Sequence, residues 1–351
     1  MMHKLTRAAL ALFALAMMSV AALAADPGAE YNQNSEVNDQ KAGSLLVYNI
    51  YTSTPAGITE DTRINLTNTS GSQSAQVHFF FIEGASCSVA DMKMCLTPNQ
   101  TVSLLAHELD PGVRGYLIVV ATDDDGCPTR HNFLIGDEYV KFAPAPGSNV
   151  GATANLGAEA FSALDASPNN CNATATATGT ALLAFTGQGI DDLPTAALKA
   201  TVAATYNRVP RVLALDNIQS RMKQNETRLI INRIGGNLAV SAGPIGPMFG
   251  ILYDDNETPL SFTISANCQY NQIVSGATIR TAPRFESFVP NDRSGWIKLF
   301  AANDRGILGS AINNHPNAAG TLGAFVGGHN LHKLTLVPLE TLVMPVFPAK
   351  C

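Results

Sequence analysis

The sequence carries the phrase Gly115-Tyr116-Leu117-Ile118-Val119-Val120-Ala121-Thr122-Asp123-Asp124-Asp125-Gly126, and a similar phrase returns later as Gly295-Trp296-Ile297-Lys298-Leu299-Phe300-Ala301-Ala302-Asn303-Asp304-Arg305-Gly306. Each has a glycine, a large aromatic residue, an apolar run and an Asp- or Asn-containing turn closed by glycine. Two earlier matches keep the same order: Asn49-Ile50 with Asn217-Ile218, and Thr62-Arg63-Ile64-Asn65-Leu66 with Thr227-Arg228-Leu229-Ile230-Ile231. Look-alike phrases in one order predict a duplicated unit.

Short strand-like runs surround these phrases. Residues 63–67 alternate cleanly, which places Ile64 and Leu66 on one face of a strand. Other runs, rich in Val, Ile, Phe and Tyr, are separated by Gly, Pro, Asn and Asp. Many short strands at such spacing are typical of an antiparallel sandwich. We therefore predict an all-β chain of two tandem immunoglobulin-like antiparallel β-sandwich domains, with little helix in the connection.

The predicted organisation begins with a signal peptide at 1–24. Lys4 and Arg7 precede an apolar run, and Ala22-Leu23-Ala24 suits cleavage; the alternative is an uncleaved anchor helix. The remaining parts are a flexible polar leader (25–42), a first β-sandwich domain (43–145), a connecting segment with short helices (146–205) and a second β-sandwich domain (206–351). Within the connection we expect one helix between Asn155 and Ala166, and another from Asp191 to about Ala204.

The composition limits the partners that the chain can have. Charged residues make up only 14% of the sequence, and the formal net charge is −6. A mildly acidic, lysine-poor surface argues against nucleic acid as a partner, because binding its backbone needs clustered cations. Few charges leave weak electrostatic repulsion between copies, which is compatible with self-association. After signal cleavage we expect no membrane span and a secreted or cell-surface protein, extracellular or periplasmic.

Cysteine usage agrees with export. The six cysteines follow the predicted cleavage site, and an even number in an exported chain predicts disulfides: Cys87, Cys95, Cys127, Cys171, Cys268 and Cys351. Sequence does not fix the connectivity, but Cys87 and Cys95 bracket a short polar loop. We expect Cys87–Cys95, Cys127–Cys171 and Cys268–Cys351. A metal site is the alternative, although no C-x-x-C spacing occurs.

Two acidic stretches are candidate calcium loops. One holds Asp123, Asp124 and Asp125, and the other begins at Asp254 and Asp255. Calcium takes carboxylate and carbonyl oxygens, and extracellular modules use it. Neither stretch has the spacing of a known calcium loop, so we favour solvated hairpin turns and expect no cofactor.

Two histidines form a second candidate metal site. On a helix, His329 and His332 would share a face, and imidazole is a common metal ligand. Their flanks resemble a loop entering a strand, however, and no acidic residue or cysteine lies nearby in the sequence. Loop histidines bonded to the backbone are therefore the favoured interpretation.

The aromatic residues of the two phrases have two interpretations. Tyr116 and Trp296 are expected to anchor the core, and the alternative is a platform that stacks on sugars. The arginines of the repeated Thr-Arg pair, Arg63 and Arg228, are expected to be surface charges rather than partners of buried carboxylates.

The sequence contains no motif of a known catalytic site. His107, Glu108 and Asp110 offer acid and base groups, but no nucleophile elbow or H-E-x-x-H pattern occurs. We expect an exported, non-enzymatic structural or adhesive protein that self-associates or binds a cell-surface or glycan ligand. The alternatives are a secreted carbohydrate- or calcium-binding module, and a secreted hydrolase with a non-standard site around His107 or His329.

Overall fold

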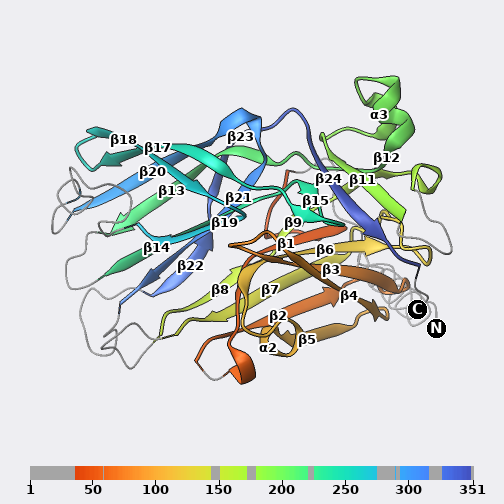
Figure 1. Cartoon of the computed structure of the whole chain (residues 1–351), viewed down its shortest axis with the longest axis horizontal. Coiled ribbons are helices and arrows are strands. Elements are labelled where there is room, and N and C mark those ends of the chain that lie inside the picture. The colour runs from red at the N-terminus through yellow and green to blue at the C-terminus, as the bar shows by residue number, and fades with distance from the viewer. Residues whose placement is uncertain are drawn as a thin grey trace, which may run out of the picture.

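A computed structural model describes residues 36–57, 59–143, 151–171, 179–219, 225–274, 289, 293–315 and 326–348. The fold is nearly all β, as predicted, and most strand pairs are antiparallel (Figure 1). The predicted signal peptide lies outside the described residues. Among the helices that the structure describes, none is long and apolar enough to cross a membrane.

The first series of strands forms two sheets. Sheet 1a has the order β4-β3-β6-β1-β9, and sheet 1b has the order β5-β2-β7-β8. The bounds are β1 Leu45–Thr52, β2 Asp61–Asn68, β3 Ala75–Glu83, β4 Val89–Leu96, β5 Thr101–Leu105, β6 Arg114–Thr122, β7 Leu134–Lys141, β8 Thr153–Gly157 and β9 Glu159–Phe161. Phe79 and Leu117 of sheet 1a share one core with Ile64 and Leu134 of sheet 1b, so the two sheets form a sandwich.

The second series repeats this topology strand for strand. Sheet 2a has the order β18-β17-β20-β13-β23, and sheet 2b has the order β19-β14-β21-β22. The bounds are β13 Pro210–Gln219, β14 Glu226–Arg233, β17 Gly246–Asp254, β18 Pro259–Ala266, β19 Gln269–Ile273, β20 Ser294–Ala301, β21 Ile307–Asn314, β22 Gly327–Asn330 and β23 His332–Leu336. Leu215 and Ile297 of sheet 2a pack with Leu229 and Ile307 of sheet 2b. The immunoglobulin-like assignment and the domain boundaries stay predictions.

The register of the strands explains the repeated phrase. Gly115 pairs with Tyr51 and Gly295 pairs with Ile218, each just after an irregularity in the β1–β6 or β13–β20 ladder. A Cβ on Gly115 would lie 1.8 Å from the carbonyl oxygen of Ile82, so only glycine permits this close approach. The same register pairs Tyr48 with Leu117 and Leu215 with Ile297, which aligns Asn49 with Asp216. The expected match of Asn49-Ile50 with Asn217-Ile218 is therefore wrong by one residue.

A third sheet, the covering sheet, packs on the outer face of sheet 1a. Its order is β10-β12-β11-β24-β15-β16, with bounds β10 Ala163–Ala166, β11 Gly179–Phe185, β12 Val202–Tyr206, β15 Gly236–Asn237, β16 Ser241–Ala242 and β24 Glu340–Val346. Tyr116 and Phe80 of sheet 1a share a core with Phe185 and Met344 of the covering sheet. Figure 1 shows β24, from the C-terminal part of the chain, beside β11.

The connection and the leader differ from the sequence prediction. The helix expected between Asn155 and Ala166 is wrong, because β8, β9 and β10 occupy this segment and pair with three different sheets. The later helix is shorter than expected: α3 spans Ala196–Thr201, where the Thr195 side chain caps it by accepting a bond from the Leu198 amide. The described end of the predicted flexible leader is partly ordered against the fold: Val37 and Lys41 are buried, and Asn38 forms a β-bridge with Ala160. The other short helical segments are η1 Pro55–Gly57, α2 Ala106–Leu109, η2 Pro168–Asn170, η3 Ile190–Asp192 and η5 Ala302–Asp304.

Apolar and polar contacts join the two sandwiches. Ile50 and Phe142 of the first sandwich pack with Ile230 on β14 and Ile312 on β21 of the second sandwich. The Asn232 amide donates to the Asn49 carbonyl at 2.7 Å, and the Tyr116 hydroxyl donates to the Arg233 carbonyl at 2.9 Å. Because these bonds satisfy buried polar groups, they fix the geometry of the junction.

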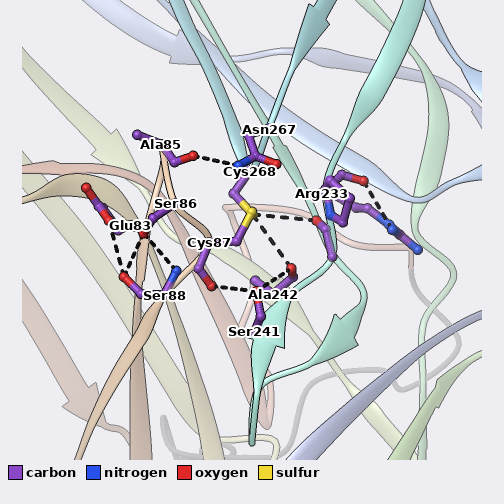
Figure 2. The surroundings of a disulfide bond; sticks show 12 residues. Glu83, Ala85, Ser86, Cys87, Ser88, Arg233, Ser241, Ala242, Asn267 and Cys268 are labelled. Atoms are coloured by element: carbon purple, nitrogen blue, oxygen red, sulfur yellow. Dashed lines mark hydrogen bonds between the residues drawn. A yellow bond between two sulfur atoms is a disulfide. The ribbon is translucent and has the colours of Figure 1, made fainter.

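A disulfide also crosses the junction. Cys87, which follows β3, is bonded to Cys268, which precedes β19, and Asn267 donates to the Ala85 carbonyl beside it (Figure 2). The expected Cys87–Cys95 pair is therefore wrong, and so is Cys268–Cys351. A local pair would have bridged a hairpin that β3 and β4 already hold by their ladder. Cys127–Cys171 is confirmed; Cys95 is disulfide-bonded, and Cys351 lies outside the described residues.

We predict that the Cys87–Cys268 bond contributes more stability than Cys127–Cys171. It joins residues 181 positions apart, against 44 for the other bond, so it removes more entropy from the unfolded chain. In the chain-entropy description the double variant Cys87→Ser/Cys268→Ser loses about 5 kcal/mol. Urea unfolding of this variant, with Cys127→Ser/Cys171→Ser as the comparison, measures the difference. Equal losses in the two variants would contradict the prediction.

A second prediction concerns pH. Glu159 of β9 is fully buried, and its carboxylate lies 2.7 Å from the ammonium of Lys333 on β23. Burial raises the pKa of Glu159 from its usual 4.5 to about 7, although Lys333 opposes the shift. Because the pKa of Glu159 is higher in the folded state, its contribution to the free energy of unfolding is complete below pH 4.5 and is lost as the pH rises through 7. The loss is about 3 kcal/mol for this group.

Unfolding free energies across pH 4.5–8 test this sign. Relative to Glu159→Gln, which cannot ionise, the wild type should lose stability as the pH rises. Glu108→Gln changes an exposed carboxylate and serves as the control. A wild type that instead gains stability over Glu159→Gln with rising pH would show that the ion pair with Lys333 outweighs the burial of the carboxylate.

Candidate functional site

The strongest candidate site is the outer face of sheet 2a. Three cross-strand pairs line it: Phe249 with Phe300, Ile251 with Lys298, and Tyr253 with Trp296. We call these six residues the aromatic face. Phe249 is 45% exposed and Trp296 is 36% exposed, although the strands alternate and their other side chains fill the core. The aromatic face is therefore apolar surface that the described chain leaves in contact with water.

The rings of the aromatic face contact one another. Tyr253 and Trp296 are stacked, with 4.7 Å between ring centroids, and the rings of Phe249 and Phe300 lie 5.9 Å apart. The ammonium of Lys298 lies 5.4 Å from the centre of the Phe300 ring. Such contacts hold the side chains in place before any partner binds, which lowers the entropy cost of association.

The repeated topology shows what the aromatic face corresponds to. In sheet 1a the equivalent cross-strand pairs are His78 with Val120, Phe80 with Ile118, and Ile82 with Tyr116, and all six residues are buried. The covering sheet packs on this region of sheet 1a. In the second sandwich β24, which follows β23, joins the covering sheet instead of packing over β17 and β20. The same face is thus covered in one sandwich and exposed in the other.

Sequence reasoning found only part of this site. Tyr116 is a core anchor as expected, but Trp296 at the equivalent position is not, because no sheet covers it. Phe249, Ile251 and Phe300 were not singled out. The sequence feature that could have indicated this face is the run from Phe249 to Tyr253, which is apolar at every position except for one glycine. Such a strand needs a partner on both faces.

The acidic stretches form hairpin turns of the same kind. One carboxylate oxygen of Asp123 accepts bonds from the amides of Asp125 and Cys127, at 3.0 and 2.9 Å. Asp254 accepts in the same way from the amides of Asn256 and Thr258, at 2.9 and 2.8 Å. Asp255 pairs with Arg293. Both first aspartates therefore stabilise their own turn, as expected of turn residues.

The histidines have a partner that the sequence did not reveal. His329 on β22 and His332 on β23 lie on either side of Asp216 of β13, with 3.2 and 3.5 Å between the Nε2 atoms and the carboxylate oxygens. Asp216 is far from both histidines in the sequence, and the pairing of β13 with β23 brings it close to them. Within the described ranges no group of three or more His, Cys, Asp or Glu is placed to hold a metal ion.

The candidate acid and base groups do not form a common centre. His107 Nδ1 lies 2.7 Å from an oxygen of Asp61, and Asp110 accepts a bond from the Tyr51 hydroxyl at 2.6 Å. Glu108 is exposed to solvent. In the part of the chain that the structure describes, the ring of His107 bonds only to Asp61, so no hydroxyl or thiol is placed for activation as a nucleophile.

Comparisons with known proteins give little similarity. No protein-family model matches the chain, and no curated protein sequence matches it. Among solved structures, it is similar to Thermotoga maritima 1070 (11% identity, TM-score 0.25), over 33% of this chain and 93% of the other. An α-L-rhamnosidase of Streptomyces avermitilis (10%, 0.19) matches over 86% of this chain and 27% of the other. The major pilin of Streptococcus pyogenes (6%, 0.20) matches over 86% and 98%. TM-scores this low carry no argument about function.

The turn geometry generates a prediction. Asp123→Ala should lower the free energy of unfolding by about 1–2 kcal/mol, because two backbone amides lose their acceptor. Asp124→Ala, one residue later, removes a carboxylate that makes no bond within the described chain and should be neutral. Urea unfolding with calcium and with EDTA measures both. A calcium-dependent rise in wild-type stability that Asp123→Ala abolishes would instead identify a calcium loop.

Proposed function

We propose that the protein is an exported, non-enzymatic structural or adhesive protein that associates with a second copy of itself through the aromatic face. The observation that carries this proposal is the contrast between the two sandwiches. Six equivalent positions are buried in the first sandwich, whereas in the second they form the aromatic face, with Phe249 and Trp296 exposed and the other four partly buried. Exposed apolar patches of this kind mark interaction sites.

A second copy is the occupant that the chemistry favours. The aromatic face holds a single charged residue, Lys298, and its ammonium already lies over the Phe300 ring. Two copies related by a two-fold axis would bring identical faces together, and the two sheets would then pack as sheet 1a packs on the covering sheet. The low charge of the chain opposes such association only weakly.

Two further features support a structural role outside the cytoplasm. The disulfides agree with an oxidising compartment, and one of them fastens the two sandwiches together. The junction also buries hydrogen bonds between the sandwiches. Secretion or display at the cell surface is part of the proposal.

A carbohydrate ligand is the second candidate, and Trp296 is the observation that favours it. Exposed aromatic rings can stack on sugars. Here Trp296 and Tyr253 cover one face of each other, with an interplanar angle of 14°, so less ring surface is free for a sugar than on a flat platform. This geometry ranks the carbohydrate alternative below self-association.

We predict that the mature chain forms dimers that Phe249→Glu weakens by at least about tenfold, because each copy would bury a carboxylate against an apolar face. The variant should remain folded, since Phe249 is 45% exposed. Sedimentation over a range of protein concentrations measures the association. Ile135→Glu is the matched control, because Ile135 is 41% exposed on sheet 1b, away from the aromatic face.

Trp296 is the only tryptophan, so its fluorescence reports directly on the aromatic face. Its emission should shift to shorter wavelength as the protein concentration rises, and Phe249→Glu should remove this shift. A wild-type chain that stays monomeric at every concentration and binds neither cells nor glycans would refute the proposal. A monomer whose Trp296 emission responds to polysaccharides would establish the carbohydrate alternative in its place.

A further inference from the structure

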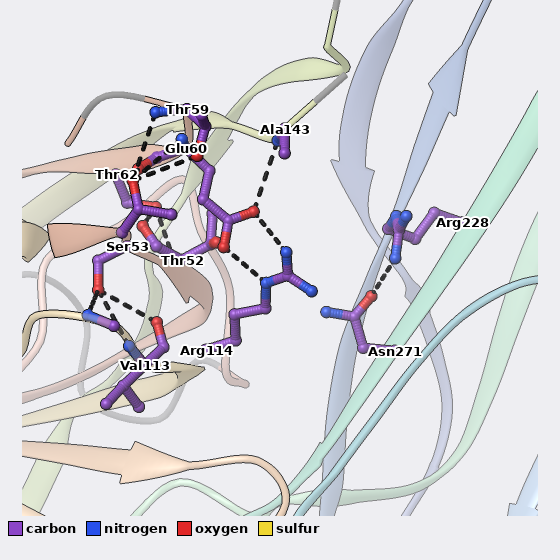
Figure 3. Close-up of polar contacts among 12 residues, drawn as sticks. Thr52, Ser53, Thr59, Glu60, Thr62, Val113, Arg114, Ala143, Arg228 and Asn271 are labelled. Atoms are coloured by element: carbon purple, nitrogen blue, oxygen red, sulfur yellow. Dashed lines mark hydrogen bonds and ion pairs between the residues drawn. The ribbon is translucent and has the colours of Figure 1, made fainter. Parts of the chain in front are cut away.

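A cleft of about 290 Å³ lies where the two sandwiches meet, away from the aromatic face. Glu60, Arg114 and Phe142 line it from the first sandwich, and Arg228, Asn271 and Gln272 line it from the second. Figure 3 shows the Arg114 side chain extending towards Asn271 and Arg228 across the junction. Two guanidinium groups from different sandwiches therefore line the same small space.

Arg114, the arginine of the first sandwich, is already paired with a carboxylate. Arg114 donates from Nε and Nη2 to the two carboxylate oxygens of Glu60, each at 2.7 Å. The Glu60 side chain is 3% exposed. Such a bidentate pair neutralises both charges and fixes the Arg114 side chain. Both carboxylate oxygens of Glu60 thus bond to Arg114, and the charge of Glu60 reaches Arg228 only at longer range.

The second arginine has no anion in the described chain. Arg228 of β14 is half-buried, and its guanidinium lies 4.9 Å from the centre of the Phe142 ring. Its Nη1 donates to the Asn271 side-chain oxygen at 2.7 Å. Among the described residues no carboxylate lies within ion-pair distance of it. The expectation that Arg228 is an ordinary surface charge is therefore wrong, and the equivalent Arg63, stacked on Tyr139, is the exposed one.

This environment is unfavourable for a cation unless an anion joins it. Burial lowers the pKa of Arg228 from its usual value, and the nearby charge of Arg114 lowers it further, while the charges of Glu226 and Glu60 oppose the shift without reversing it. A guanidinium has five N–H donors in a rigid planar fork, and within the described ranges one of them has an acceptor. The stacking on Phe142 holds the fork in one orientation, which prepares it for two parallel hydrogen bonds.

We propose that this cleft is a binding site for the carboxylate group of a small acidic ligand. Arg228 supplies the charge and a bidentate pair of donors, and the side chains of Asn271 and Gln272 also line the cleft. The volume suits a ligand about the size of a single sugar ring carrying a carboxylate. The site is separate from the aromatic face and does not depend on the function proposed above.

Calorimetric titration of the full mature chain with glucuronate tests the proposal. The wild type should bind glucuronate and should not bind glucose, which lacks the carboxylate. Arg228→Gln should weaken binding by roughly tenfold or more, because it removes a charge-assisted bidentate contact. Arg63→Gln, the equivalent arginine of the other sandwich, should bind as the wild type does.

Asn271→Asp gives an independent test in case Arg228→Gln fails to fold. It places a carboxylate beside Arg228, so it should abolish glucuronate binding and leave the melting temperature unchanged or higher. No heat with glucuronate, or equal affinity in the wild type and Asn271→Asp, would overturn the proposal. Phe249→Glu should leave this binding unchanged, so the two proposals fail separately.

Discussion

Sheet 1a is apolar on both faces, and the rest of the fold depends on this constraint. Every residue of β1 is buried, and so are nearly all residues of β6 and β3. One face is covered by sheet 1b, as in any sandwich, so the other face requires a further layer. The chain builds that layer from the connection between the sandwiches, from an insert of the second series and from β24. Sheet 2a has similar strands, but no layer of the described chain covers its outer face, and its exposed aromatic side chains follow from that difference.

The sequence allowed the β class and the repeated topology to be predicted, because these depend on local patterns. Alternation in β2, the glycines at 115 and 295 and the acidic turns all have local causes. The segment 155–166 misled the prediction, because its apolar residues fit a helix as well as three short strands. Only the sheets that it joins decide between them, since tertiary contacts override weak local preference.

The features of the candidate sites depend on contacts between distant residues, and these could not be predicted. The short loop between Cys87 and Cys95 favoured a local disulfide, whereas Cys87 bonds to Cys268 in the other sandwich. Asp216 meets His329 and His332 only through strand pairing. Arg63 and Arg228 are equivalent in sequence, yet only Arg228 faces the junction. Distant contacts also decide the burial of the aromatic face and its equivalent in sheet 1a. The covering sheet packs on sheet 1a, whereas no described layer packs on the aromatic face of sheet 2a.

The path of β24 affects how the protein reaches its final shape. The covering sheet cannot be completed until residues 340–346 arrive, after the whole second series has been synthesised. During synthesis, the outer face of sheet 1a therefore lacks its full partner while more than a hundred further residues are added to the chain. Contacts of such long sequence separation form slowly, and exposed apolar strands aggregate in the interval. The first sandwich is therefore synthesised early but completed last, and its outer face stays open to aggregation until β24 has paired.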